Sequence, residues 1–313
     1  MTAVSPAASP AASSAASLSP RIDHAVINVG RRLDDAQARF ERLGFQLTPR
    51  GHHSRGTSNH LVILGSDYIE LIGVEPSRTG VVDWGHPPGL VGLVFKTDDA
   101  RRLAAELAGR GVPLDPAGAS DLSRPVDLAD GGTRDARFLT LRLAPERVAN
   151  GRVFFCEHRT PELVWQAAWQ RHPNGATGVA EYVYAAEDPA RAAALVGQVF
   201  ASTPIVEVPG GRRMAAGVGS GAAAVSWLVP DEIVRRYGDA ALAPIHDPAM
   251  AGADRAIALE LAVADVAAAK AALDAGQVPY TVQPDGGLRV APGQALGTTL
   301  VFRPAASPAA PRA

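Results

Sequence analysis

The chain has 313 residues, of which 47% are hydrophobic, and its 30 basic and 32 acidic residues leave a formal charge of −2. No basic block is interleaved with aromatic residues, which argues against nucleic acid and against an anionic membrane surface as partners. The single cysteine, Cys156, cannot form an internal disulfide, and no apolar stretch is long enough to cross a bilayer. We therefore expect a cytoplasmic protein with a sizeable core.

The two ends of the sequence are dominated by Ala, Ser and Pro. Residues 1–20 lack the basic start and the continuous apolar run of a signal peptide. Such a composition buries too little apolar surface to offset the entropy of ordering the chain. We predict disordered tails at residues 1–20 and 305–313.

The first predicted module begins with an apolar, β-branched strand at residues 22–29. A helix follows, with an Asp of the Asp34-Asp35 pair as its cap and Gly44 at its end. Two further strands, at residues 59–64 and 68–74, are joined by a Gly-Ser-Asp sequence that is typical of a tight turn.

The same order of elements recurs three times along the chain. Each recurrence has a strand, an Asp-capped helix and two more strands; the predicted strands are residues 90–96, 137–143 and 152–158, then 179–185, 213–218 and 222–229, then 256–263, 288–291 and 298–302. This repetition predicts an α+β chain of four β-α-β-β-β modules. Prolines and glycine interrupt the pattern at residues 161–177, so we predict module pairs at 21–160 and 178–304, joined by this linker.

The first module resembles the vicinal oxygen chelate superfamily, which includes glyoxalase I and the extradiol dioxygenases. The resemblance is carried by Asp23-His24, by residues 43–45 and by residues 68–72; residues 56–59, 157–165 and 172–176 are similar, more narrowly, to bacterial glyoxalase-like domain proteins. It covers residues 21–178, and the order of modules alone extends it to residue 303. It implies that the modules pair into two cup-shaped mixed sheets with helices outside.

The resemblance also implies a divalent metal, Zn²⁺, Ni²⁺, Mn²⁺ or Fe²⁺, held by side chains of the first and last strands of a cup. The matching positions are His24, Glu70 and Glu157, while the fourth position, near Gly92, has no side chain that can bind a metal. If the register of the last strand slips by one residue, His158 replaces Glu157 in the cup.

Structural explanations compete with this interpretation. His24 could be a core histidine that donates to a backbone carbonyl, Glu70 could pair with an arginine, and Glu157 could lie in water at the end of its strand. For substrate binding we expect Asn59, His60 and Arg124. The adjacent residues His52 and His53 are interpreted as solvated loop histidines, because they lie between Gly51 and Gly56.

These residues favour an enzyme that binds vicinal oxygens of a small organic substrate in the first cup. Glu70 or Glu157 would move a proton at the carbon next to a carbonyl, which is lyase or isomerase chemistry. An Fe²⁺ dioxygenase is the alternative, favoured by the register that brings in His158. A metal-free small-molecule binding protein is a third reading. The second module pair lacks the ligand set and is expected to be a degenerate half, and a homodimer is compatible with the sequence.

Overall fold

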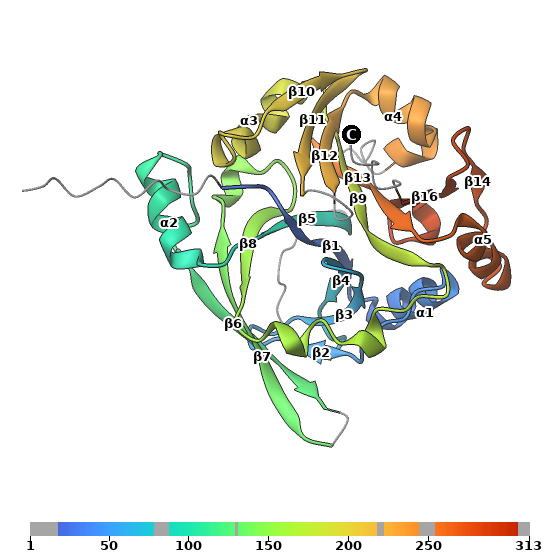
Figure 1. Ribbon diagram of the computed structural model, residues 1–313, viewed down its shortest axis with the longest axis horizontal. Helices are drawn as coiled ribbons and strands as arrows, with labels where there is room; N and C mark the ends of the chain where they lie inside the picture. Colours follow the sequence, from blue (N-terminus) through green and yellow to red (C-terminus); the bar gives the residue numbers. More distant parts are fainter. Residues whose placement is uncertain (1–17, 78–87, 129–130, 218–221, 244–253, 306–313) are drawn as a thin grey trace, which may run out of the picture.

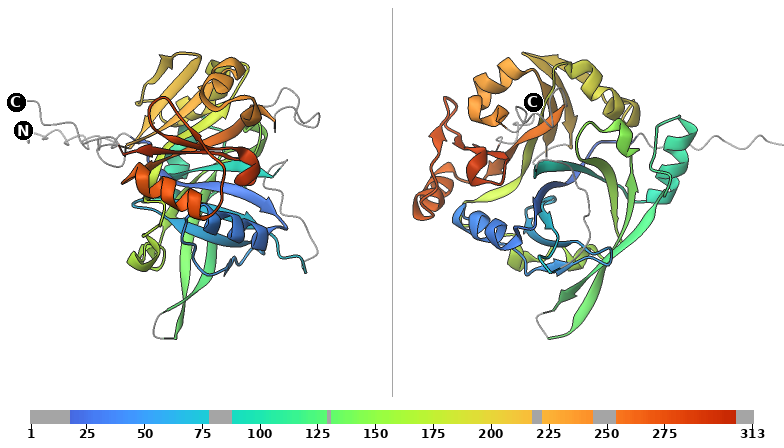
Figure 2. Two further views of the ribbon diagram at one scale, coloured as in Figure 1. Left: turned by 90° about the vertical axis from the view of Figure 1, so that its right-hand side faces the viewer. Right: turned by 180° about the vertical axis from the view of Figure 1, so that it is seen from behind.

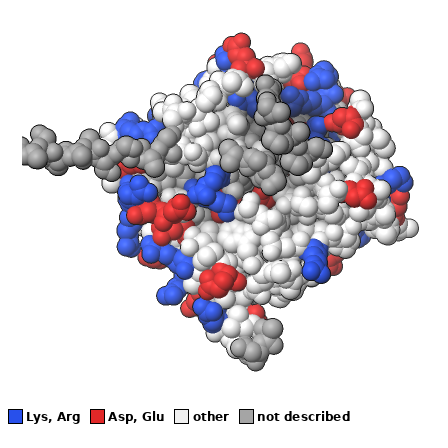
Figure 3. Space-filling view, viewed as in Figure 1, with Lys and Arg blue, Asp and Glu red and all other residues white. Residues whose placement is uncertain are grey.

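The computed structural model describes residues 18–77, 88–128, 131–217, 222–243 and 254–305 (Figure 1). Nearly all of the two predicted tails lies outside these ranges. Within them, no helix is long and apolar enough to span a membrane. On the face shown in Figure 3, Lys and Arg are interspersed with Asp and Glu and form no block of one sign.

Two eight-stranded mixed sheets form the frame of the molecule. The first has the strand order β2-β3-β4-β1-β5-β8-β7-β6. Its strands are β1 (Ile22–Gly30), β2 (Gly51–His52), β3 (Ser58–Ile63), β4 (Tyr68–Gly73), β5 (Gly89–Lys96), β6 (Ser120–Asp127), β7 (Thr133–Arg142) and β8 (Arg152–His158). The view from behind in Figure 2 shows this sheet, blue to green, strongly curled, and β6 and β7 project from it as a long hairpin.

The second sheet has the order β10-β11-β12-β9-β13-β16-β15-β14. Its strands are β9 (Ala176–Ala185), β10 (Ile205–Val208), β11 (Gly211–Ala216), β12 (Ala223–Leu228), β13 (Arg255–Val263), β14 (Thr281–Val282), β15 (Leu288–Val290) and β16 (Thr299–Pro304). Strand β1 is parallel to β4 and antiparallel to β5, and β9 has the same relations to β12 and β13. The predicted fold class, α+β with two cup-shaped mixed sheets, is confirmed.

In the described part of the chain, five α-helices connect these strands: α1 (Leu33–Arg42), α2 (Ala100–Gly109), α3 (Pro189–Val199), α4 (Pro230–Tyr237) and α5 (Val266–Ala275). Asp99, Asp188 and Asp265 cap α2, α3 and α5, each accepting a hydrogen bond from a backbone N–H of the first turn. The predicted Asp cap of the first helix is wrong. The N-cap residue of α1 is Arg32, and the two aspartates lie inside the first turn, where they complement the helix dipole.

One continuous apolar core joins the two halves of the molecule. Phe200 of the second half packs against Phe95 and Phe155 of the first, with ring centroids 4.7 and 5.9 Å apart. Each concave face carries a separate, smaller apolar cluster. We call these concave faces of the first and second sheets the first cup and the second cup.

Candidate active site

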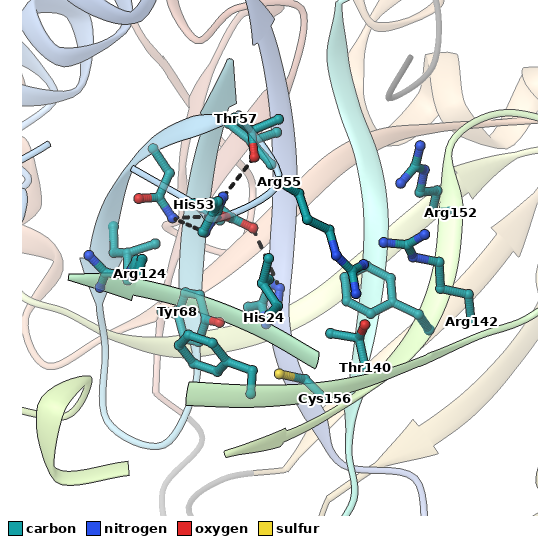
Figure 4. A pocket seen from close by; sticks show the side chains of 17 residues that line it. His24, His53, Arg55, Thr57, Tyr68, Arg124, Thr140, Arg142, Arg152 and Cys156 are labelled. Carbon is teal, nitrogen blue, oxygen red and sulfur yellow. Dashed lines mark hydrogen bonds and ion pairs between the residues drawn. The ribbon is translucent and has the colours of Figure 1, made fainter. Parts of the chain in front are cut away.

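A cavity with an empty volume of about 710 Å³ lies in the first cup (Figure 4). Strand alternation selects which side chains reach it, because successive residues of a strand point to opposite faces. Tyr68, Glu70 and Ile72 of β4 line the cavity, as do Phe154 and Cys156 of β8. Its wall is thus largely apolar, and a buried carboxylate lies within it.

His24 reaches the cavity from β1, beside a buried aspartate. The register between β1 and β5 shifts between Ile22 and His24, and such an irregularity lets the intervening Asp23 turn toward the same side. Asp23 Oδ2 lies 2.7 Å from His24 Nδ1 and 2.9 Å from His158 Nε2, and its Oδ1 accepts from Lys96 Nζ at 3.0 Å. Burial alone would raise the pKa of Asp23, but the charge of His158 and hydrogen bonds from both histidines hold it well below its usual value.

This aspartate fixes the tautomer of His24. An ionised carboxylate can only accept hydrogen bonds, so His24 Nδ1 must carry the proton it donates to Asp23. In the neutral ring the lone pair is then on Nε2, which lies 3.7 Å from Glu70 Oε2. The imidazole is stacked on Tyr68, with ring centroids 4.3 Å apart.

His53 approaches the same carboxylate from the opposite side. Its Nε2 lies 3.6 Å from Glu70 Oε1, and its Nδ1 lies 2.7 Å from Thr57 Oγ1. Asn59 Nδ2 is within hydrogen-bond distance of both Glu70 Oε1, at 2.7 Å, and His53 Nε2, at 3.2 Å. Because an amide N–H can only donate, His53 Nε2 accepts and also presents a lone pair.

The interpretation of His53 as a solvated loop histidine is wrong. Its side chain is 6% exposed, whereas that of the adjacent His52 is 63% exposed. The backbone N–H of His53 donates to Thr57 O, which closes a turn that folds the ring back over the cavity. Burial lowers the pKa of His53, against the opposing charge of Glu70, and so favours the neutral ring. The sequence signals of this turn are Gly56, whose φ of 96° favours glycine, and Thr57, four residues after His53.

Glu157, expected as a metal ligand and a catalytic residue, lies on the face of β8 away from the cavity. Its Oε2 accepts from the backbone N–H of Ala100, at the start of α2, and its Oε1 lies 2.7 Å from Arg159 Nε. Alternation explains this placement, since Cys156 faces the cavity and Glu157 must therefore point the other way. His158 is on the cup side, and its Nε2 is engaged by Asp23.

Of the expected substrate-binding residues, Asn59 and Arg124 line the cavity and His60 does not. His60 follows Asn59 on β3 and points to the opposite face, where its Nδ1 bonds to Thr48 O at 3.0 Å. Arg124 is 5% exposed, and burial lowers its pKa. A Cβ at Gly51 would lie 2.6 Å from both Arg124 Nη1 and Asn59 Oδ1, so a glycine is required beside these two side chains.

Two sets of side chains could hold a metal ion. Asp23, Cys156 and His158 offer ligand atoms that lie within 4.8 Å of one another. Asp23 already accepts from three donors, however, and burial raises the pKa of the Cys156 thiol well above its usual value. The second set, His24, His53 and Glu70, is less compact, because its ligand atoms do not all lie within 4.8 Å of one another; each imidazole Nε2 lies 3.6–3.7 Å from one oxygen of the Glu70 carboxylate. Asn59 Oδ1, buried and without a hydrogen-bond partner among the described residues, adds an oxygen donor nearby.

A family model described as a glyoxalase-like domain matches residues 22–200. No curated protein matches the sequence. Among solved structures, a hypothetical protein from Staphylococcus aureus superposes with a TM-score of 0.60 at 14% identity, over 91% of this chain and 99% of its own.

Two further solved structures superpose on more than nine-tenths of this chain. A mutant of 4-hydroxymandelate synthase from Streptomyces coelicolor gives a TM-score of 0.52 at 14% identity, covering 92% of this chain and 94% of its own. A xylose isomerase-like TIM barrel/4-hydroxyphenylpyruvate dioxygenase fusion protein gives 0.51 at 13%, over 97% of this chain and 52% of its own. At these identities the likeness shows a shared fold, and the fold together with the family match is that of the vicinal oxygen chelate superfamily.

Proposed function

Since this chain belongs to the glyoxalase-like domain family, we propose that it is a metal-dependent enzyme acting on a small organic substrate in the first cup. The proposed reaction is of the lyase or isomerase type, and the proposed ligands of a divalent ion are His24, His53 and Glu70. One observation carries the proposal: two imidazole nitrogens with lone pairs lie 3.6–3.7 Å from the oxygens of one buried carboxylate.

This donor set fits a divalent cation. The lone pair of His24 Nε2 faces Glu70 Oε2 with no described donor between them, and burial strengthens a repulsion that a cation would relieve. On the other side of the carboxylate, Asn59 Nδ2 already donates to both His53 Nε2 and Glu70 Oε1. Neutral imidazole and carboxylate ligands suit Zn²⁺, Ni²⁺, Mn²⁺ and Fe²⁺. Asp23 supplies the support that metal-binding histidines usually have, a carboxylate that fixes the tautomer and the ring orientation.

When bound, such an ion would act as a Lewis acid on the substrate oxygens. The side chains of the protein orient the metal ligands, exclude water from the cavity and supply a proton acceptor. Stacking on Tyr68 and the bond to Asp23 hold the His24 ring in place, and the apolar walls exclude water, which strengthens every charge interaction inside. Asn59 donates to Glu70 Oε1 and orients the carboxylate, and the carboxylate oxygen that does not hold the ion would accept a proton from the substrate.

An Fe²⁺-dependent, oxygen-using reaction is the second candidate. Two histidines and one carboxylate are the ligand set typical of non-haem Fe²⁺ oxygenases, and His53 supplies a second imidazole beside that of His24. The two candidates differ in their need for dioxygen, so oxygen uptake by the iron-loaded protein separates them.

The first experiment is metal analysis by mass spectrometry on protein purified without chelators. We expect near-stoichiometric metal in the wild type and loss of about tenfold or more in affinity in His24→Ala, His53→Ala and Glu70→Gln. The matched control is His52→Ala, which removes the exposed neighbouring histidine and should leave the metal content unchanged. Absence of metal after each ion is added back would refute the proposal and favour a metal-free binding protein.

A further inference from the structure

Three arginines gather at the more exposed end of the cavity. We call Arg55, Arg142 and Arg152 the mouth arginines; all three line the cavity, and Figure 4 shows their guanidinium groups on one side of it, away from Arg124. Strand pairing explains the position of two of them. Arg142 of β7 pairs with Phe154 of β8, and Arg152 lies two residues before Phe154, so these arginines are diagonal neighbours on one face.

Among the described residues, the positive charge of Arg55 and Arg142 is poorly compensated. Arg55 donates to the backbone carbonyl of Asp121 and forms no ion pair with any described residue. The carboxylate nearest to Arg142 is that of Asp115, 4.0 Å away. Burial and the nearby charge of Arg55 both lower the pKa of Arg142, as expected for cations held together. Like charges in such proximity are unfavourable unless an anion relieves them.

The two ends of the cavity therefore differ in chemistry. At the inner end lie His24, Glu70 and Asn59, all buried, and at the outer end lie the mouth arginines. Phe154 lies between them, since its ring is 5.8 Å from that of His24 and its strand position pairs with Arg142.

We propose that the mouth arginines bind a terminal anionic group of the substrate, a carboxylate or a phosphate, at the end of the cavity away from His24 and Glu70. The assignment of the reacting end to His24 and Glu70 rests on the proposed function, whereas the terminal-anion site depends on the mouth arginines alone. Arginine suits this role because its planar fork binds carboxylate and phosphate through paired hydrogen bonds.

Isothermal titration calorimetry with paired probes tests the proposal. 2-Oxoglutarate is compared with 2-oxopentanoate, which lacks the distal carboxylate, and 3-phosphoglycerate with glycerate, which lacks the phosphate. We expect at least one dianion to bind about tenfold or more tightly than its partner, since hydrogen bonds to charged groups contribute about 1.5–3 kcal/mol. The pair that shows the preference identifies the anion as carboxylate or phosphate.

Arg142→Gln should weaken binding of the preferred dianion about tenfold and of its monoanionic partner less than twofold. Arg55→Gln, in an exposed loop, is a second variant with little risk to folding, and it should act in the same direction. The control is Arg101→Gln, which removes an equal charge from the exposed surface of α2 and should change neither affinity.

Equal binding within both pairs, no binding of any probe by the wild type, or equal loss for dianion and monoanion in Arg142→Gln would each overturn the proposal. Metal analysis of the same preparations keeps it separate from the proposed function. A dianion preference without bound metal would refute the metal-dependent reaction and retain the terminal-anion site. Bound metal without that preference would refute the terminal-anion site and retain the metal-dependent reaction.

Discussion

The two cups carry polar side chains at matching strand positions but surround them differently. His24 of β1 and Glu181 of β9 occupy matching positions. His24 pairs with Tyr68, two residues before Glu70, and Glu181 pairs with Ala224, two residues before Ser226. In the first cup these groups border a cavity. In the second, Ser226 Oγ donates directly to Glu181.

The second cup is filled by its own chain. Helix α4 and the 3₁₀ turn η5 (Asp239–Leu242) place Ile233, Tyr237 and Leu242 against the strands. Tyr237 Oη donates to Glu260 Oε1 at 2.5 Å, and Arg303 pairs with the same carboxylate. A buried acid in such a cup can therefore have either of two surroundings. It can border a site that requires a ligand, as in the first cup, or its charge can be neutralised by neighbouring side chains, as in the second.

The largest effect is expected where the first cup depends on one carboxylate. Asp23→Asn removes the charge that His24, His158 and Lys96 share, and breaking such a buried set typically costs about 3–5 kcal/mol of unfolding free energy. The folded-state pKa of Asp23 is depressed. The stabilisation is therefore complete above the ordinary value of 3.8 and is lost as pH falls toward the lower folded-state value.

Urea unfolding at pH 7 and pH 3 measures this effect, which should be larger at pH 7. Asp98→Asn is the matched control, because the side chain of Asp98 is 88% exposed and its pair with Arg21 should contribute less than about 1 kcal/mol. If Asp23→Asn is no more destabilising than the control at pH 7, the buried network does not hold the first cup together.

A smaller effect is expected from the second cup. Arg303→Met leaves the carboxylate of Glu260, which is 2% exposed, without its cation, although Tyr237 still donates to it. Because the Arg303 side chain is partly exposed, we expect a loss of about 2 kcal/mol, below the range for fully buried pairs. Arg213→Gln, which removes a more exposed arginine 3.6 Å from Glu181, should cost less than about 1 kcal/mol. Metal content of the first cup should be unchanged in both variants, and a loss in Arg303→Met alone would mean that the cups are coupled.

The order of the elements could be predicted from the sequence because its signals are local. Asp caps and the alternation of apolar residues act within a few positions, and Asp99, Asp188 and Asp265 cap helices as expected. Strand β6 was missed because its residues are mostly polar, include Pro125 and form an edge strand. Helix α4 was missed because it follows β12 directly, where the module pattern has no helix.

The candidate site was predicted only in part because its geometry is non-local. Alternation indicates that Glu157 and Cys156 face opposite sides of the sheet, but it does not indicate which side faces the cavity. In the structure Glu157 faces α2, where it accepts from Ala100 N–H, and Cys156 faces the cavity. Asp23 faces His158 because the register between β1 and β5 is irregular at this point, and the residue pattern does not predict that irregularity. His53 depends on a turn that folds back over a distant strand.

The smallest effect concerns pH and separates the two cups by sign. Burial and the neighbouring charge of Glu181 raise the pKa of Glu260, against the opposing charge of Arg303. With a raised folded-state pKa, the folded chain retains a proton that the unfolded chain releases. The associated stability is therefore present below the ordinary value of 4.5 and declines as pH rises through the folded-state value.

Glu260→Gln removes this titration and keeps an oxygen for the hydrogen bond from Tyr237. The unfolding free energy of the wild type minus that of Glu260→Gln should fall as pH rises from 4.5 to 8. The unfolding free energy of the wild type minus that of Asp23→Asn should increase as pH rises from 3 to 7. Unfolding free energies of both variants across this range give the two slopes. Opposite slopes would mean that the first cup holds its acid as an anion among cations while the second cup favours the protonated acid; slopes of the same sign would show that Arg303 keeps Glu260 ionised and that the two cups treat their buried acids alike.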